Sequence, residues 1–329
     1  MSALIDDDVL MTMAGIAYAA PGDVAGYLQQ ARPTAAWTVN WLPDPGTPPD
    51  NFAYMARRAD SNDYVLAIRG TYPDPFSQAY WDDASQDSPF GDMVDWPGAP
   101  GAKIAQGTNT AFSNLWALRD ADGCSMHDIV QALPASASVT VTGHSLGGTL
   151  TPVIALQLAE AFPQLSIQAS SFAGMTPGNS AFAALFGSGT KLEGCVRRVF
   201  NTLDTVAYGW DKVYATHDFY TPAPKGGVIV SAMLLATAAR LQLGGYDFTA
   251  VGTPVPLQGE VRKPVIPCEL VAYVLENLHQ HMPDTYLSLL GAPPLPFSIG
   301  FGSILRPRDK AADKTPAAAL RLDVAHLPA

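Results

Sequence analysis

Residues 139–160 read VTVTGHSLGGTLTPVIALQLAE. The first four, residues 139–142, are all β-branched and predict a strand. From residue 150 to residue 160 apolar side chains recur at roughly helical spacing among good helix formers, which predicts a helix. The stretch GHSLG, residues 143–147, lies between the two. A strand, a glycine-serine-glycine turn and a helix in this order are typical of a nucleophile elbow.

The turn is expected to impose a strained backbone conformation on Ser145. Side chains two residues to either side would collide with the neighbouring strand and helix, so Gly143 and Gly147 are needed there. The Leu146 N–H, on the first turn of the expected helix, has no intrahelical partner and can bind an oxyanion. The alternative interpretation is a glycine-rich turn with an inert serine. The remaining residues of a catalytic triad distinguish between the two.

Composition excludes several classes of function. Of the 329 residues, 48% are hydrophobic and 15% are charged, which is typical of one large globular α/β domain. The net charge of −11 argues against binding to nucleic acid or to anionic membranes, because both require cationic surfaces. The sequence contains no run of 18 or more apolar residues, so no transmembrane helix is predicted. The acidic start, MSALIDDD, differs from a secretory signal, so we expect a cytoplasmic protein or a secreted one whose signal has been removed.

The three cysteines are widely spaced and form no C-x-x-C motif. They are typical of reduced thiols rather than of a metal site or a disulfide framework, although one bridge with one free thiol also fits their number. The three are Cys124, Cys195 and Cys268.

Strand and helix patterns alternate between residues 50 and 205, which predicts a mostly parallel sheet covered by helices on both faces. Strands are expected at 37–42, 52–58, 64–69, 139–142, 166–172 and 196–203. Helices are expected at 9–20, 108–119, 126–133, 146–160, 182–186, 228–241, 269–278 and 284–290.

Two segments have more than one interpretation. The long irregular stretch 71–100 is either a surface loop with some aromatics packed into the core, or a wall or flap over an apolar substrate site. Its aromatic residues are Tyr72, Phe76, Tyr80, Trp81, Phe90 and Trp96. The apolar helix expected at 228–241 either packs inward or forms a lid that contacts membranes. The residues expected to pack inward are Met233, Leu234, Leu235, Ala238 and Leu241.

A catalytic serine requires an adjacent base, and the base requires an orienting carboxylate. After a nucleophile elbow the order along the chain is serine, acid, histidine. Asp204 directly follows the strand expected at 196–203, where the acid should lie. His279 and His281 precede the last expected helix and are the candidates for the base. This H-x-H pair could also bind a metal, which is the less favoured interpretation.

Five segments in order carry a family resemblance. They are VLAIRGT (65–71), Trp81 with the acids after it, VTGHSLGG (141–148), FAGMTPGN (172–179) and RVFNTLDTV (198–206). Over roughly residues 10–290 the chain resembles the fungal-type, or class 3, triacylglycerol lipases, which have the α/β-hydrolase fold. The resemblance implies that Ser145 is the nucleophile and Asp204 the orienting acid. It also implies that backbone N–H groups of Thr71 and Leu146 form the oxyanion hole, with the Thr71 hydroxyl as an auxiliary donor.

The resemblance also distinguishes between the two histidines. The family often has a histidine followed five residues later by a tyrosine and an apolar helix. His281 with Tyr286 fits this pattern and His279 does not, which implies that His281 is the base.

The chain departs from the family pattern at two places. Ala207 stands where a proline commonly follows D-x-V. The stretch between Asp204 and His281 is longer than usual, which leaves room for a cap insertion over residues 207–265. We therefore expect a catalytic domain over residues 1–290, followed by a proline- and alanine-rich tail, 291–329, that packs on the domain or trails from it.

The expected function is that of a serine-dependent carboxylic ester hydrolase of lipase type, which cleaves acylglycerol esters through an acyl-enzyme on Ser145. The reaction needs no metal or cofactor, and the expected partner is a lipid or ester substrate, with transient contact to a lipid interface. A phospholipase A1, a short-chain esterase and a feruloyl-type esterase are alternatives, since one elbow serves all of them. A catalytically inactive hydrolase fold used as a binding module is a further alternative.

Overall fold

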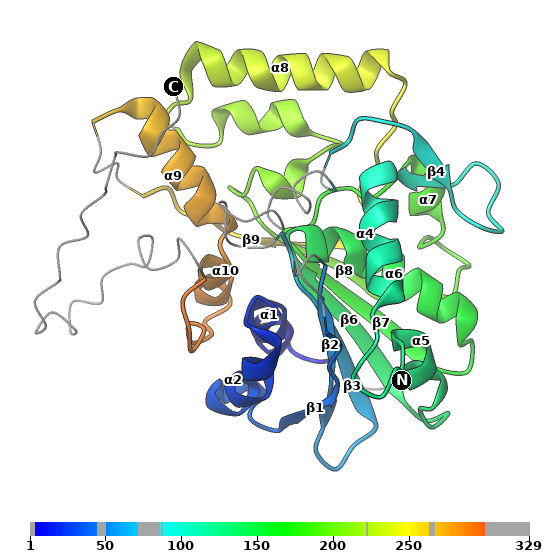
Figure 1. The fold of residues 1–329 in the computed structure, drawn as a ribbon. Helices are drawn as coiled ribbons and strands as arrows, with labels where there is room; N and C mark the ends of the chain where they lie inside the picture. The colour runs from blue at the N-terminus through cyan, green and yellow to red at the C-terminus, as the bar shows by residue number, and fades with distance from the viewer. Residues whose placement is uncertain are drawn as a thin grey trace, which may run out of the picture.

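A sheet of seven strands forms the centre of the protein in this computed structural model, which describes residues 4–44, 51–71, 86, 88–221, 223–262 and 267–299 (Figure 1). In spatial order the strands are β1 (Trp37–Trp41), β2 (Ala53–Arg58), β3 (Asp63–Ile68), β6 (Ser138–His144), β7 (Ser166–Phe172), β8 (Val196–Asn201) and β9 (Thr253–Leu257). The first three are antiparallel, and β3, β6, β7, β8 and β9 run parallel. A mostly parallel sheet was predicted from the sequence, and the prediction is confirmed.

The register of the parallel strands brings their carboxyl ends to one edge of the sheet. Ile68 of β3 pairs with Gly143 of β6, and His144 pairs with Phe172 of β7. Every residue of β6 is buried, as expected for a central strand covered on both faces. The segments that follow β3, β6 and β8 therefore meet at this edge, where ligands bind in open α/β sheets.

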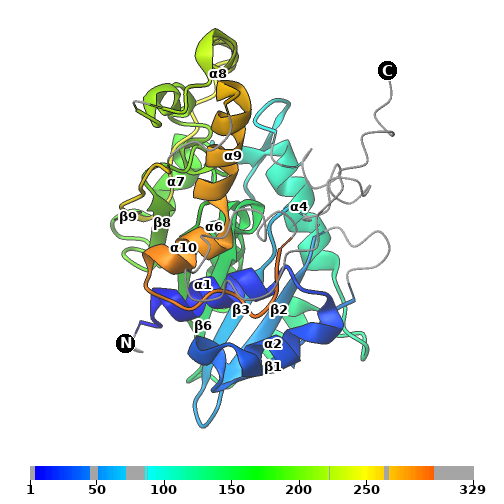
Figure 2. The same cartoon turned by 90° about the vertical axis from the view of Figure 1, so that its left-hand side faces the viewer.

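Helices cover both faces of the sheet (Figure 2). One face packs against α4 (Gln106–Ala117), α5 (Met126–Gln131), α6 (Leu146–Ala161) and α7 (Ser180–Ala184). The other packs against α1 (Asp7–Ile16), α2 (Val24–Gln30) and α10 (Pro283–Leu289). A small two-stranded sheet, β4 (Met93–Asp95) with β5 (Lys103–Ala105), lies outside the central one. The three cysteines are free thiols.

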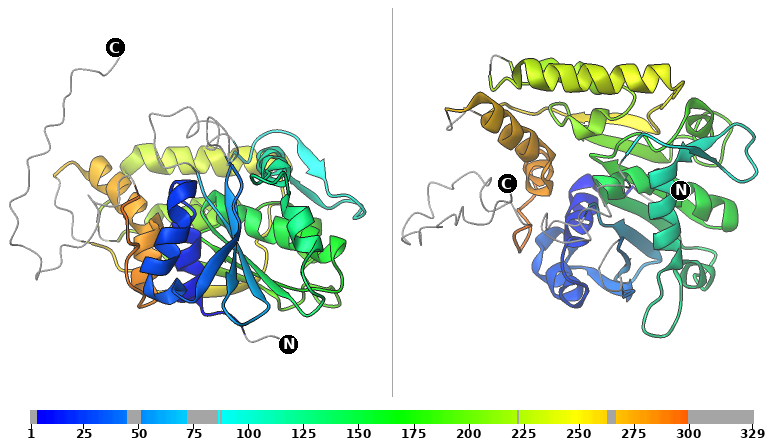
Figure 3. Two further views of the ribbon diagram at one scale, coloured as in Figure 1. Left: turned by 60° about the horizontal axis from the view of Figure 1, so that its bottom comes forward. Right: turned by 45° about the horizontal axis from the view of Figure 1, so that its top comes forward.

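Between β8 and β9 the chain leaves the sheet. It forms two 3₁₀ segments, η3 (Val206–Tyr208) and η4 (Val213–Asp218), and then the helix α8 (Gly227–Leu243). These elements lie at one end of the molecule (Figures 1 and 3). The range predicted for a cap insertion, 207–265, is too long, because it includes β9, which pairs with β8 in the central sheet.

The prediction of which α8 residues pack inward is wrong in part. Leu241 is buried, and Leu234 and Ala238 are partly buried, but Met233 and Leu235 are 65% and 55% exposed. No helix in the described ranges is long and apolar enough to cross a membrane.

The stretch 71–100 and the tail 291–329 are described in part. Trp96, at the end of the stretch 71–100, is buried against Phe112 and Phe182, as expected for an aromatic packed into the core. Residues 72–85, with most of the aromatics considered for a flap, lie outside the described residues. Leu295 and Ile299 are buried in the core that contains α1 and α10, so the first part of the tail packs on the domain.

Candidate active site

Ser145 lies at the sharp turn between β6 and α6. Its backbone angles, φ 60° and ψ −125°, are strained for a residue with a side chain. A Cβ atom added at Gly143 would lie 2.3 Å from the Gly147 carbonyl oxygen, and one added at Gly147 would lie 2.3 Å from the Ile68 carbonyl oxygen. Both positions therefore require glycine, as predicted from the sequence.

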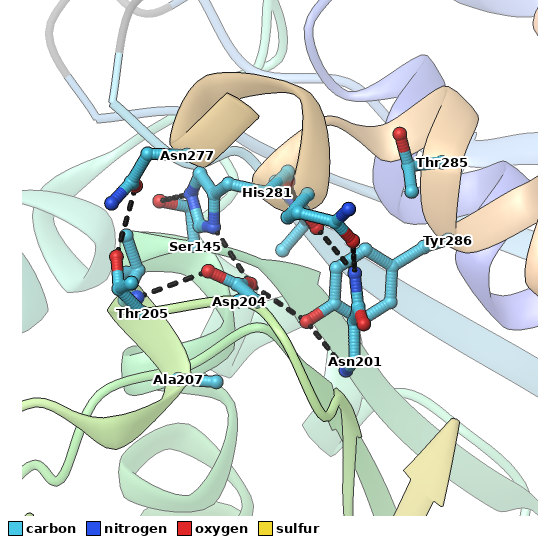
Figure 4. A network of polar contacts seen from close by, with 12 residues as sticks. Ser145, Asn201, Asp204, Thr205, Ala207, Asn277, His281, Thr285 and Tyr286 are labelled. Atoms are coloured by element: carbon cyan, nitrogen blue, oxygen red, sulfur yellow. Dashed lines mark hydrogen bonds and ion pairs between the residues drawn. The ribbon is translucent and has the colours of Figure 1, made fainter. Parts of the chain in front are cut away.

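A chain of hydrogen bonds joins the three residues that the sequence marked as candidates (Figure 4). Ser145 Oγ lies 2.8 Å from His281 Nε2, and His281 Nδ1 lies 2.9 Å from Asp204 Oδ2. Asp204 is fully buried and Ser145 is 8% exposed. The carboxylate can only accept at Nδ1, so the imidazole carries its proton there and Nε2 accepts the serine proton. The arrangement can deprotonate the serine hydroxyl.

Asp204 is held by groups outside this chain. Tyr286 Oη donates to Asp204 Oδ2 at 2.7 Å, and the Val206 N–H donates to Oδ1 at 3.0 Å. Burial, with the neighbouring Asp204 charge, raises the pKa of Tyr286 well above its ordinary value, so its hydroxyl stays protonated and can donate. In the sequence Tyr286 served only to distinguish His281 from His279. Its contact with Asp204 has no signal in the sequence.

His281 is the last residue of α9 (Glu269–His281), and two contacts hold this helix against the segment around Asp204. Thr205 Oγ1 donates to Asn277 Oδ1 at 2.9 Å. The Asn201 side-chain amide donates to Gln280, at 2.9 Å to its carbonyl oxygen and at 2.7 Å to its Oε1. The helix extends beyond the predicted end at residue 278 and so carries His281 to the serine.

His279 has different neighbours. Its Nδ1 lies 3.3 Å from the Thr285 hydroxyl, and burial, with Arg262 nearby, lowers its pKa to about 4. The two histidines of the H-x-H pair therefore face different partners. No group of three or more His, Cys, Asp or Glu that could hold a metal is found in the part of the chain that the structure describes.

His144, beside Ser145, contacts both Tyr18 and His281. Its Nε2 lies 2.7 Å from the His281 carbonyl oxygen, which can only accept, so this nitrogen carries the proton. Its Nδ1, 2.9 Å from the Tyr18 hydroxyl, then accepts from that hydroxyl. Burial, and secondarily the nearby His281, lower the pKa of His144 well below its ordinary value. A neutral His144 thus holds the backbone of His281, while Asp204 holds its imidazole ring.

Replacing Tyr18 with phenylalanine should lower kcat on a soluble ester by about tenfold and leave KM nearly unchanged. Without the Tyr18 donor, His144 can move its proton to Nδ1 and lose its bond to the His281 carbonyl oxygen. Separate kcat and KM values test this, with Tyr27→Phe on the neighbouring helix α2 as the control. An unchanged kcat would contradict a positioning role for this contact.

The stability of the protein should decrease as pH falls from about 6.5 towards 4. His144 and His279 have lowered pKa values in the folded protein, while unfolded histidine titrates near 6.5. Below that pH the unfolded chain binds protons that the folded chain does not, so acid favours unfolding, by at most about 1.4 kcal/mol per pH unit for His144. Denaturant unfolding at several pH values measures this. His279→Gln should reduce the dependence, and His127→Gln, at a side chain 42% exposed, should retain it.

The residues expected to form the oxyanion hole lie close to the serine on two sides. Leu146 begins α6, where backbone N–H groups lack intrahelical partners. A Cβ atom added at Gly70 would lie 2.6 Å from the His144 carbonyl oxygen and 3.0 Å from Ser145 Cβ, so the end of β3 packs directly against the turn. Thr71 follows Gly70 at this contact.

Ala207, where the sequence departs from the family pattern, is buried in η3. Its carbonyl oxygen accepts a short hydrogen bond from Arg198 Nη2. Together with the bond from the Val206 N–H to Asp204, this contact closes the loop around the acid without a proline.

Comparison with known proteins agrees with the family resemblance seen in the sequence. Residues 65–208 match the family model described as lipase (class 3). No curated protein matches the sequence. Among solved structures, the M37 lipase superposes with a TM-score of 0.69 at 24% identity, over 87% of this chain and 92% of that one, which shows a common fold.

More distant matches include a Rhizomucor miehei lipase in complex with its propeptide, at 20% identity over 61% of each chain with a TM-score of 0.47. A triacylglycerol lipase from Penicillium expansum matches at 19% identity over 78% of this chain and 82% of that one, with a TM-score of 0.46. The matched family segment spans the end of β3, the nucleophile turn and Asp204. On this evidence residues 65–208, which contain Ser145 and Asp204, are similar to the class 3 lipase family, and the chain as a whole shares the fold of the M37 lipase.

Proposed function

We propose that this protein hydrolyses acylglycerol esters through an acyl-enzyme on Ser145. Asp204 orients the base His281, and the backbone N–H groups of Thr71 and Leu146 stabilise the oxyanion. The observation that carries the proposal is the unbroken chain of hydrogen bonds from Ser145 Oγ through His281 to Asp204. An inert serine in a glycine-rich turn has no need of a buried carboxylate and a histidine aligned in this way.

Each step of the reaction uses a group in this chain. His281 Nε2 takes the proton as Ser145 Oγ attacks the ester carbonyl, and Asp204 stabilises the imidazolium that forms. The tetrahedral oxyanion binds the two N–H groups, each of which contributes about 2.7–4 kcal/mol in related sites. His281 then protonates the leaving alcohol. Water repeats the cycle on the acyl-enzyme and releases the carboxylic acid.

Asp204→Asn should lower kcat by about 10⁴-fold, less than removal of the serine or the base. An amide can donate towards His281 Nδ1 and so favours the tautomer in which Nε2 carries the proton and cannot accept one. Steady-state kinetics on a soluble ester measure the loss. A variant with wild-type kcat would exclude Asp204 as the orienting acid.

A hydrolysis profile tests the substrate class. Purified protein is assayed on p-nitrophenyl esters of increasing acyl length and on emulsified triolein, with Ser145→Ala in parallel. The proposal predicts activity on long acyl chains and triolein that disappears in the variant. Activity confined to short soluble esters, to phospholipid or to feruloyl esters would instead indicate one of the alternative esterases. Absence of all turnover would favour a binding module.

A further inference from the structure

Large apolar side chains are exposed mainly on two helices. Of the ten such residues in the described part of the chain, five lie on α8 and three on α9, with Leu4 and Tyr214 as the remaining two. The eight are Val228, Ile229, Met233, Leu235 and Leu243 on α8, and Leu270, Val271 and Val274 on α9. We call these eight residues the apolar rim. Surface patches of this kind usually mark interaction sites.

The exposed residues of α8 all lie on one side of the helix. At 3.6 residues per turn the five project within an arc of roughly 160°, and the buried Leu241 lies outside this arc. Val228 and Leu243, near the two ends of the helix, are 86% and 90% exposed, so this face is open along its full length. The helix carries a single charge, on Arg240, which projects within this arc and whose guanidinium lies 3.8 Å from the centroid of the Phe90 ring.

The exposed residues of α9 also share one face, near the amino-terminal end of that helix. Figures 1 and 2 show this end of α9 and the whole of α8 at the same end of the molecule. The other end of α9 carries His281, seven residues or about 10 Å along the axis from Val274. The α9 part of the apolar rim therefore lies on the same helix as His281, the proposed base.

Charge and shape identify the partner of this surface. The net charge of −11 opposes binding to anionic surfaces, and α8 offers no row of cations to overcome it. A single helix about 25 Å long, whose outer face is apolar apart from Arg240, is suited to partial burial in a lipid layer. The proposed function provides the reason for such contact, because long-chain acylglycerols are located in lipid droplets and layers rather than in water.

We propose that the apolar rim docks the protein on an uncharged or zwitterionic lipid surface, with the outer face of α8 lying in the interface and the amino-terminal end of α9 beside it. This inference rests on the proposed function and extends it. Docking would hold the active site next to the lipid phase, since α9 runs from the rim to His281. Asn277, between the two, bonds to Thr205 next to the catalytic acid.

Vesicle binding tests the proposal without turnover. Full-length Ile229→Gln/Met233→Gln is compared with Leu4→Gln, which changes an exposed leucine outside the rim. Flotation with phosphatidylcholine vesicles should show an affinity lower by about tenfold or more for the double variant, and wild-type affinity for Leu4→Gln and Ser145→Ala. Activity on emulsified triolein should fall in parallel, while kcat/KM on p-nitrophenyl butyrate stays within about twofold of wild type.

Equal vesicle binding by the double variant and the wild type would overturn the proposal. So would size-exclusion chromatography that shows a dimer lost in the double variant, because the rim would then contact a second copy. Failure of the proposed function has a different signature. In that case the wild-type protein would bind vesicles through the rim but hydrolyse neither soluble nor emulsified esters.

Discussion

Ser145→Ala should lower kcat on a soluble ester by on the order of 10⁶-fold, with the fold intact. The serine provides the only atom that becomes bonded to the acyl group, so without it His281 and Asp204 have no hydroxyl to activate. The substitution removes one oxygen from a side chain that is 8% exposed. The strained backbone at this residue is a property of the turn and remains in the variant.

Steady-state kinetics on p-nitrophenyl butyrate measure this loss. Circular dichroism and thermal unfolding of the variant provide the control for folding. Ser136→Ala, at an exposed serine that bonds to Asn62, serves as the matched substitution and should retain full activity. If the Ser145→Ala protein itself retained substantial turnover, the assignment of the nucleophile would be refuted.

His281→Ala should cause a loss of similar size, whereas His279→Ala should change kcat by less than about tenfold. His281 contacts both Ser145 and Asp204, and a triad whose members act as a unit loses most of its effect when any of them is removed. His279 instead contacts Thr285. Because the two positions are two residues apart on one helix, each variant is the control for the other. The reverse result would exchange their roles.

The nucleophile turn could be predicted because its signals are local. β-Branched residues, two obligatory glycines and a helical apolar pattern follow one another within 139–160, and the structure has β6, the turn and α6 there. The order of Ser145, Asp204 and His281 along the chain limited the candidates for the triad to a few residues. The structure brings these three within hydrogen-bond distance. Their catalytic roles remain predictions for the experiments above.

Strand β9 could not be predicted because its sequence, TPVPL, resembles a loop. Proline lacks the N–H that a central strand needs, so Pro254 and Pro256 argue against a strand. The sheet order resolves the contradiction. β9 lies at the edge of the sheet, where one side needs no hydrogen-bonded neighbour. Only the assembled sheet shows that this position tolerates two prolines.

The residues that hydrogen-bond to members of the triad also could not be predicted from the sequence. Tyr18 and His144 are 126 residues apart, and Tyr286 and Asp204 are 82 apart, so no local pattern links them. The exposed side of α8 was predicted incorrectly for a related reason. An apolar helix with few polar residues does not indicate which of its faces meets the core, and Met233 and Leu235 lie on the outer one.

The central claim is that Ser145 is activated by His281 and Asp204. Reaction with a fluorophosphonate probe, followed by peptide mass spectrometry, tests it most directly, because the probe forms a covalent bond with an activated serine whatever the natural substrate is. The account predicts a single adduct on the peptide containing Ser145, absent in Ser145→Ala and formed far more slowly in His281→Ala. An adduct on another serine, or hydrolytic activity without any labelling of Ser145, would contradict it.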